Sequence, residues 1–121
     1  NIATLIHPSA IVGDRCSIGE GSILCPRTIM SCDISIGKGT LLNSGATVGH
    51  DAILGDFNVL SPQTDITGHV RMGDENFFGS HASVLPHVRL HNQCQVAAGS
   101  IVYYGFKQNG LTLKGDPARP L

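Results

Sequence analysis

The sequence predicts an all-β chain wound into a parallel solenoid, and two periodic observations lead to that fold class. An apolar residue recurs at every sixth position from Ile6 to Val102, and the phase never slips. Four positions after most of these lies a small residue, such as Ala10, Ser22 or Thr40. One large and one small inward side chain in each six-residue repeat is the pattern of stacked β coils. An α-helix is excluded because its 3.6-residue period does not match and because Gly and Asn recur in the repeat.

Each repeat is expected to hold one short strand that ends near its large apolar residue and is followed by a tight turn. The position after that apolar residue is often glycine, and we expect these glycines to open the turn with positive φ. The large apolar positions are Ile6, Val12, Ile18, Leu24, Met30, Ile36, Leu42, Val48, Leu54, Leu60, Ile66, Met72, Phe78, Val84, Leu90, Val96 and Val102. The glycines that follow them are Gly13, Gly19, Gly37, Gly49, Gly55, Gly73 and Gly79.

These repeats resemble the left-handed β-helix of hexapeptide acyltransferases. The resemblance implies that three repeats make one triangular coil of 18 residues, with left-handed crossovers that depart from the usual right-handed rule. Sixteen repeats, residues 6–101, then form just over five coils of a single domain that covers residues 1–121. The period stops after Val102, so residues 102–121 are expected to form a short C-terminal tail with a turn at Gly115–Ala118.

The composition excludes several classes of function. A formal net charge of -1 and 14% charged residues argue against nucleic acid or an anionic membrane surface as the partner. No apolar run approaches the roughly 20 residues that span a bilayer, and the N-terminus lacks the positive charges of a signal peptide. The four cysteines form no C-x-x-C pair, so we expect reduced thiols in a cytoplasmic protein. Because the chain starts at Asn1, we expect a piece of a longer protein or a trimmed chain.

With coils of 18 residues, the middle residue of each strand points outward and stacks on its equivalents in the neighbouring coils. The first face is an apolar ladder, which we expect to pack against a second subunit in a closed trimer; a cover formed by the C-terminal tail is the alternative. The outward residues are Ile23, Leu41, Val59, Phe77 and Gln95 on the first face, Ile11, Ile29, Thr47, Asp65, Ser83 and Ile101 on the second, and Ser17, Ser35, Ile53, Arg71 and Arg89 on the third. Inside the prism, Asn58 and Asn76 break the small-residue rule and are expected to stack as a hydrogen-bonded amide ladder.

The candidate chemistry lies in the middle of the array, where His50 directly precedes Asp51 at a turn. The 18-residue step places Asp51, His69 and His87 in one column and sets His50 over Gly68. A carboxylate beside an imidazole fixes its tautomer, and such an imidazole can act as a general base. The Gly68 turn leaves room for a thin substrate arm, and its N–H could serve an oxyanion. The alternative is a surface histidine that merely neighbours a surface aspartate.

A second resemblance narrows this hypothesis. The residues that carry it are Val48-Gly49-His50-Asp51-Ala52-Ile53-Leu54-Gly55-Asp56-Phe57, Gly68, Phe78-Gly79, Ala97-Ala98-Gly99-Ser100 and Gly115-Asp116-Pro117-Ala118. They resemble the sialic acid O-acetyltransferase (NeuD) family, which includes N-acetyltransferases of UDP-linked amino sugars in bacillosamine and perosamine synthesis. The H-D/E-x-x-x-G-D/E-F string is the specific part, whereas the repeats specify only the fold.

The resemblance implies an acetyltransferase that uses acetyl-CoA, needs no metal, forms a homotrimer and places its active site between subunits. Its acceptor is expected to be a sugar or nucleotide sugar used in bacterial surface glycan synthesis. The resemblance gives His50 the role of catalytic base and Asp51 that of the acid that supports it. The positions expected to contact acetyl-CoA, largely through backbone atoms, are Gly68, Gly79, Ser80, Ala98 and Gly99. The basic residues expected to reach the phosphates of CoA as point charges are Lys107, Lys114 and Arg119.

The chain departs from that family at two points. Family members often carry a second histidine nine residues after the base, and Val59 occupies that position here. They also usually carry an N-terminal Rossmann-like domain that binds the nucleotide sugar, which this sequence does not include.

Two other functions stay open on the sequence. One is a hexapeptide prism that trimerises and binds ligands without catalysis. The other is a metal enzyme like the γ-carbonic anhydrases, which needs three histidines around zinc, whereas only His69 and His87 stack in this register. The sequence does not name the acceptor, and it does not separate O-acetylation from N-acetylation.

Overall fold

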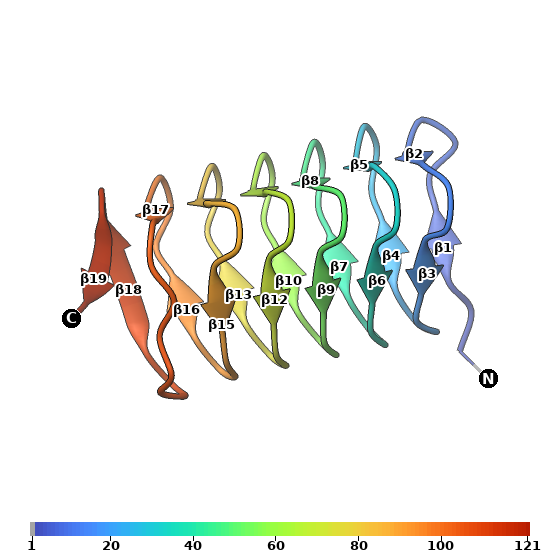
Figure 1. The fold of residues 1–121 in the computed structure, drawn as a ribbon. Helices are drawn as coiled ribbons and strands as arrows, with labels where there is room; N and C mark the ends of the chain where they lie inside the picture. Colours follow the sequence, from blue (N-terminus) through green and yellow to red (C-terminus); the bar gives the residue numbers. More distant parts are fainter. Residues whose placement is uncertain (1) are drawn as a thin grey trace.

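The computed structural model describes residues 2–121, which form strands and turns without any helix (Figure 1). A two-residue strand occurs once in every six residues through most of the chain, and two longer strands follow at the C-terminus. The strands are β1 (Leu5–Ile6), β2 (Ile11–Val12), β3 (Ser17–Ile18), β4 (Ile23–Leu24), β5 (Ile29–Met30), β6 (Ser35–Ile36), β7 (Leu41–Leu42), β8 (Thr47–Val48), β9 (Ile53–Leu54), β10 (Val59–Leu60), β11 (Asp65–Ile66), β12 (Arg71–Met72), β13 (Phe77–Phe78), β14 (Ser83–Val84), β15 (Arg89–Leu90), β16 (Gln95–Val96), β17 (Ile101–Val102), β18 (Thr112–Gly115) and β19 (Ala118–Pro120).

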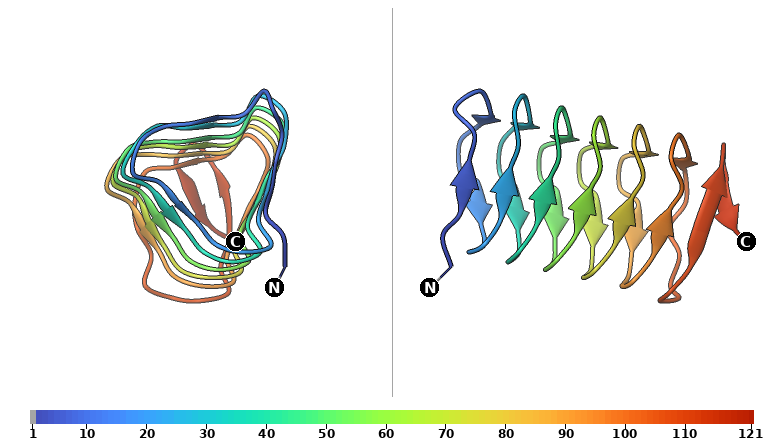
Figure 2. Two further views of the ribbon diagram at one scale, coloured as in Figure 1. Left: turned by 90° about the vertical axis from the view of Figure 1, so that its right-hand side faces the viewer. Right: turned by 180° about the vertical axis from the view of Figure 1, so that it is seen from behind.

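The strands stack into three sheets that form the sides of a triangular prism (Figure 2). Sheet A has the order β1-β4-β7-β10-β13-β16-β18-β19, sheet B the order β17-β14-β11-β8-β5-β2, and sheet C the order β15-β12-β9-β6-β3. Pairing among β1 to β17 is parallel, and each residue lies opposite the one 18 positions later, as Val59 lies opposite Phe77. The predicted parallel β-helix is therefore confirmed, with about six turns; its left-handed winding stays a prediction.

The predicted phase also holds, because every large apolar position is the second residue of a strand. From Leu24 to Val102 these side chains are buried and form one continuous core along the prism axis. In the first coil Ile6 and Val12 remain 47% and 37% exposed, since no coil within residues 2–121 covers that end. The hydrophobic stabilisation thus comes from one coil stacking on the next.

The prediction that the repeat glycines adopt positive φ was wrong. The residues with positive φ lie two positions further on and are often bulky, as at Asp51, where φ is 62°. The glycines are needed because the coils approach closely: a Cβ on Gly49 would lie 2.6 Å from Gly68 N, and one on Gly79 would lie 2.5 Å from Ala98 N. The glycines explained in this way are Gly13, Gly19, Gly37, Gly49, Gly55, Gly73 and Gly79.

Asn58 and Asn76 form the expected ladder inside the prism. Asn76 donates to Asn58 Oδ1 through both its backbone N–H, at 2.9 Å, and its Nδ2, at 3.1 Å. The Asn76 Oδ1 accepts from the backbone N–H of Cys94 at 2.9 Å, and its Nδ2 also reaches the carbonyl oxygen of His91 at 2.9 Å. The two buried amides therefore satisfy each other and the adjacent turn, as buried polar groups must.

The C-terminal tail closes the end of the prism instead of covering a face (Figure 1). Strand β18 extends sheet A beyond β16, and β19 pairs with it antiparallel. Leu113 and Ala118 in this hairpin are fully buried. The outward ladder of sheet A stays open to solvent, with Ile23 40% and Phe77 46% exposed, so the tail is not the cover that the sequence allowed.

Residues 2–121 hold no helix with the length and apolarity to cross a bilayer.

Replacing Asn76 by Ala should lower the free energy of unfolding by about 2–4 kcal/mol, because the Cys94 N–H and the His91 carbonyl lose this buried partner and Asn58 Oδ1 keeps only the backbone N–H of residue 76. Asn109→Ala is the matched control, since it removes an exposed amide that accepts one backbone bond from Asn92. Denaturant-induced unfolding followed by circular dichroism measures both. Equal losses in the two variants would contradict a structural role specific to the ladder.

Candidate active site

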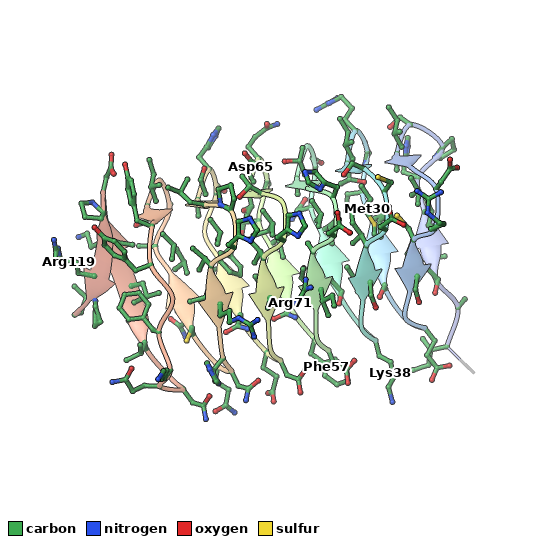
Figure 3. The ribbon with its side chains drawn as sticks, viewed as in Figure 1. Met30, Lys38, Phe57, Asp65, Arg71 and Arg119 are labelled. Carbon is green, nitrogen blue, oxygen red and sulfur yellow. The ribbon has the colours of Figure 1, made fainter. Side chains whose placement is uncertain are left out.

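The turn between β8 and β9, at the corner where sheet B meets sheet C, carries His50 and Asp51. The Asp51 backbone N–H donates to the carbonyl of Cys32 in the preceding coil at 3.2 Å. Its own carbonyl accepts from Arg71 Nη1 at 2.6 Å, and Arg71 lies on the sheet C side of the corner (Figure 3). The turn is therefore fixed to the coils on both sides. Asp tolerates this left-handed conformation better than most residues.

The two side chains are hydrogen-bonded to each other, with His50 Nδ1 3.0 Å from Asp51 Oδ2. An ionised carboxylate can only accept, so this contact favours the tautomer in which Nδ1 carries the proton and Nε2 presents a lone pair. The side chains are 58% and 46% exposed, so neither is enclosed by its own chain. The pair has the chemistry of a general base with an orienting carboxylate.

Gly68 lies directly beneath the imidazole, as the register predicted. A Cβ at this position would come within 3.0 Å of His50 Nε2 and 3.2 Å of Cε1. The backbone N–H of Gly68 donates to no other backbone group within residues 2–121. The glycine thus keeps clear the space in front of the basic nitrogen and leaves a backbone donor nearby.

The predicted column of Asp51, His69 and His87 is present. His69 Nε2 lies 3.8 Å from Asp51 Oδ2, and the His69 ring meets the His50 ring edge to face, with centroids 5.1 Å apart and an interplanar angle of 88°. His87 stacks on His69 at 4.6 Å with an interplanar angle of 7°. His69 therefore touches both members of the His50–Asp51 pair and restricts the positions that the His50 ring can take.

The column that contains Asp51 continues toward the N-terminus with Asp33 and Arg15, which form an ion pair. Arg15 Nε donates to Asp33 Oδ1 at 2.6 Å and its Nη2 donates to Oδ2 at 3.1 Å. The hydrogen bond from Arg15 lowers the pKa of Asp33 below its usual value. Desolvation, followed by the contact with Asp33, raises the pKa of the Cys32 thiol. Asp51 is therefore the carboxylate of this column that remains for His50.

The other sequence-predicted contact residues lie at a different corner. Gly79, Ser80, Ala98 and Gly99 occupy the turns where sheet A meets sheet B, and the Gly99 N–H donates to the Ser80 carbonyl at 2.9 Å. Lys114 is exposed on β18 in the C-terminal hairpin. Sheet B separates these groups from His50, so one chain does not bring all the predicted positions into one site.

Val59 points outward from β10 in sheet A, away from the His50 corner of its own chain, and stacks between Leu41 and Phe77.

Arg71 is a site residue that the sequence placed on the third face but did not connect to His50 and Asp51. Its register was predictable, but its bond to the Asp51 carbonyl depends on a side-chain conformation that no sequence pattern encodes.

One group of side chains within residues 2–121 has the donor atoms for a metal ion, namely His50, Asp51 and His69, whose ligand atoms all lie within 4.8 Å of one another. It contains two imidazoles and one carboxylate, whereas the carbonic-anhydrase arrangement uses three histidines. His50 Nδ1 and Asp51 are already bonded to each other, so the geometry is better described by a base and its carboxylate.

Solved structures similar to this chain were found in large number. The acetyltransferase domain of PglB from Neisseria gonorrhoeae is 30% identical, with a TM-score of 0.95, over 99% of this chain and 58% of that one. Perosamine N-acetyltransferase from Caulobacter crescentus, in a histidine-to-asparagine variant with CoA and GDP-perosamine, is 31% identical, with a TM-score of 0.96, over 99% of this chain and 57% of that one. WeeI from Acinetobacter baumannii is 29% identical, with a TM-score of 0.90, over 94% of this chain and 56% of that one.

Along its whole length the chain is similar to hexapeptide-repeat sugar acetyltransferases. The resemblance expected from the sequence is thereby confirmed. The chain spans less than three fifths of the length of these relatives. No model of a protein family and no curated protein sequence matches it.

Replacing His69 by Asn should loosen the His50 ring, because the substitution removes the edge-to-face contact and the imidazole beside Asp51. His81→Asn is the matched control, since His81 has nearly the same φ, 63° against 61°, but lies at another corner. Nitrogen-detected NMR of the histidine side chains should show a single Nδ1-protonated His50 in the parent and the control, and tautomer mixing in His69→Asn. An unchanged His50 spectrum in His69→Asn would contradict this role.

Proposed function

We propose that this chain is an acetyltransferase that moves the acetyl group of acetyl-CoA to an amino group of a nucleotide-linked sugar. The observation that carries the proposal is the His50–Asp51 pair, 3.0 Å apart over the cleared space at Gly68, within a fold similar throughout to sugar acetyltransferases. A related PglB domain has been solved with acetyl coenzyme A, and perosamine N-acetyltransferase with CoA and GDP-perosamine. N-acetylation is favoured over O-acetylation because the named activity of the latter relative is an N-acetyl transfer.

In this proposal His50 Nε2 takes a proton from the acceptor nitrogen as that nitrogen forms its bond to the thioester carbonyl carbon. The Asp51 carboxylate holds Nδ1–H and stabilises the imidazolium that results. The Gly68 N–H supplies a donor for the carbonyl oxygen as it becomes negative. The carbon–sulfur bond then breaks, and His50 returns the proton to the departing sulfur. Atoms and charge balance without any further reactant.

The exposure of His50 suggests that a second copy of the chain completes the site. The apolar ladder of sheet A is the surface available for that contact, with Phe77 46% and Ile23 40% exposed. A closed homotrimer, in which each chain offers its sheet A to a neighbour, would let the A–B corner of one copy approach the His50 corner of the next. The residues at that A–B corner, where the acetyl-CoA arm would lie, are Gly79, Ser80, Ala98 and Gly99. Lys114, on β18 at the C-terminal end of the prism, would contact the coenzyme. The proposed place of action is the cytoplasm.

A trimeric prism that binds a ligand without catalysis is the competing function. Val59 favours it, because the related family often has a histidine at that position. The half-exposed His50–Asp51 pair favours catalysis, because a binding module needs no general base facing the cleared space at Gly68.

His50→Ala should lower kcat with acetyl-CoA and a nucleotide-linked amino sugar by about 10² to 10⁴, the usual contribution of a general base. Asp51→Asn should lower it less, because the imidazole remains. His7→Ala, which removes an exposed imidazole from the first coil, should leave turnover unchanged. The rate of thioester cleavage, detected through the coenzyme thiol that is released, measures the activity of all three variants. Full activity in His50→Ala would rule out the assigned base, and binding of acetyl-CoA without turnover in the parent chain would favour the binding module.

Phe77→Asp should break the assembly, because it puts a charge into the apolar ladder of sheet A, whereas Ser35→Asp on the exposed part of sheet C should not. Sedimentation velocity should find a trimer for the parent and for Ser35→Asp, and a monomer for Phe77→Asp. Activity should disappear together with the trimer. A parent chain that sediments as a monomer would contradict the proposed assembly.

A further inference from the structure

Cationic side chains gather on sheet C, below the active-site corner, around two adjoining hollows. The first hollow, of about 320 Å³, is lined by His87, Arg89, His91, Gly105, Phe106 and Lys107. The second, of about 240 Å³, shares Arg89 and His91 and extends to Arg71 and Asn92. Neither hollow is lined by a carboxylate. The chain as a whole carries a formal net charge of -1, so this local excess of positive charge is not a consequence of its composition.

The first hollow is built by a segment outside the repeat. After Val102 the chain runs alongside β15, where the Phe106 N–H donates to the Arg89 carbonyl at 3.1 Å and Phe106 forms a parallel bridge with Leu90. Gly105 makes this close approach possible, since a Cβ there would lie 2.7 Å from the Arg89 carbonyl oxygen. These backbone contacts bring Lys107 to the same hollow as Arg89.

The charges in the first hollow are uncompensated. The ion pairs found within residues 2–121 involve Arg15, His50 and His69, so neither Arg89 nor Lys107 has a carboxylate partner there. Arg71, at the edge of the second hollow, differs because its guanidinium donates to the Asp51 carbonyl. Like charges held close together repel, and a bound anion would relieve that repulsion.

We propose that Arg89, Lys107, His87 and His91 bind a phosphate or diphosphate group of a substrate. A guanidinium can hold two phosphate oxygens at once, a lysine adds a point charge, and the imidazoles add N–H donors. The hollow is joined to the catalytic corner, because His87 stacks on His69 at 4.6 Å and His69 Nε2 lies 3.8 Å from Asp51 Oδ2. The inference rests on the proposed function, in which both the acetyl donor and a nucleotide-linked acceptor carry a diphosphate.

Calorimetric titration of the full chain with inorganic pyrophosphate tests the site without any turnover. Arg89→Gln and Lys107→Gln should each weaken binding about tenfold or more, the loss of one charge-assisted contact. Lys38→Gln is the control, because it removes the same single charge from an exposed turn nearer the N-terminal end of the prism, outside both hollows. Binding by Arg89→Gln and Lys107→Gln as tight as that of Lys38→Gln would overturn the proposal, and so would a parent chain that does not bind pyrophosphate.

Steady-state kinetics then separates the two sources of the diphosphate. A rise of about tenfold in the KM for acetyl-CoA alone in Arg89→Gln assigns the hollow to the coenzyme, and the same rise for the nucleotide-linked sugar alone assigns it to the acceptor. An unchanged KM for both substrates would overturn the assignment to a substrate. Pyrophosphate binding that depends on Arg89 and Lys107 in a chain without acetyl transfer would retain the anion site and reject the proposed function.

Discussion

The hydrogen bonds between successive coils are the constraint on which the rest of this structure depends. They hold each residue in line with the one 18 positions further on, as when the His69 N–H donates to the His50 carbonyl at 2.9 Å. Each strand from β1 to β17 contributes only two residues, so no coil could bury its core alone. The same bonds that stack the core also stack the turns. A side chain at a turn therefore finds its neighbours in the coils before and after it, not along its own strand.

The left-handed turn position is the second consequence of that stacking. Asp51, His69 and His87 all adopt φ between 61° and 68°, in a region that costs non-glycine residues on the order of 1 kcal/mol each. The coil-to-coil hydrogen bonds impose this conformation whatever the side chain. Residues spaced 18 apart in the sequence can therefore place functional side chains in one column. The imidazole rings stacked beside His50 form such a column.

The triangular cross-section divides the candidate site. His50, Asp51 and Gly68 share one corner, whereas Gly79, Ser80, Ala98 and Gly99 share another, with sheet B between them. A rigid prism cannot fold these corners together. If both groups serve one reaction, they must meet across an interface between copies, and the exposed apolar ladder of sheet A offers the surface for one. The cationic hollow lies on sheet C, the third side of the prism, and is connected to the His50 corner by the stacked rings of His87 and His69.

The sequence by itself determined the repeat, the register and the two columns at the His50 corner, because a fixed period converts chain position directly into position on the prism. It also predicted the Asn58–Asn76 ladder, since those were the large polar residues at inward positions. Only the tertiary structure decided which turn residue adopts positive φ, because that follows from how closely the coils approach and not from where glycine occurs. It also decided that the tail closes the end of the prism and docks Phe106 on β15, since residues outside the period carry no register. The hydrogen bond from Arg71 to the Asp51 carbonyl was also decided by the tertiary structure, because the conformation of a long side chain depends on the residues packed around it.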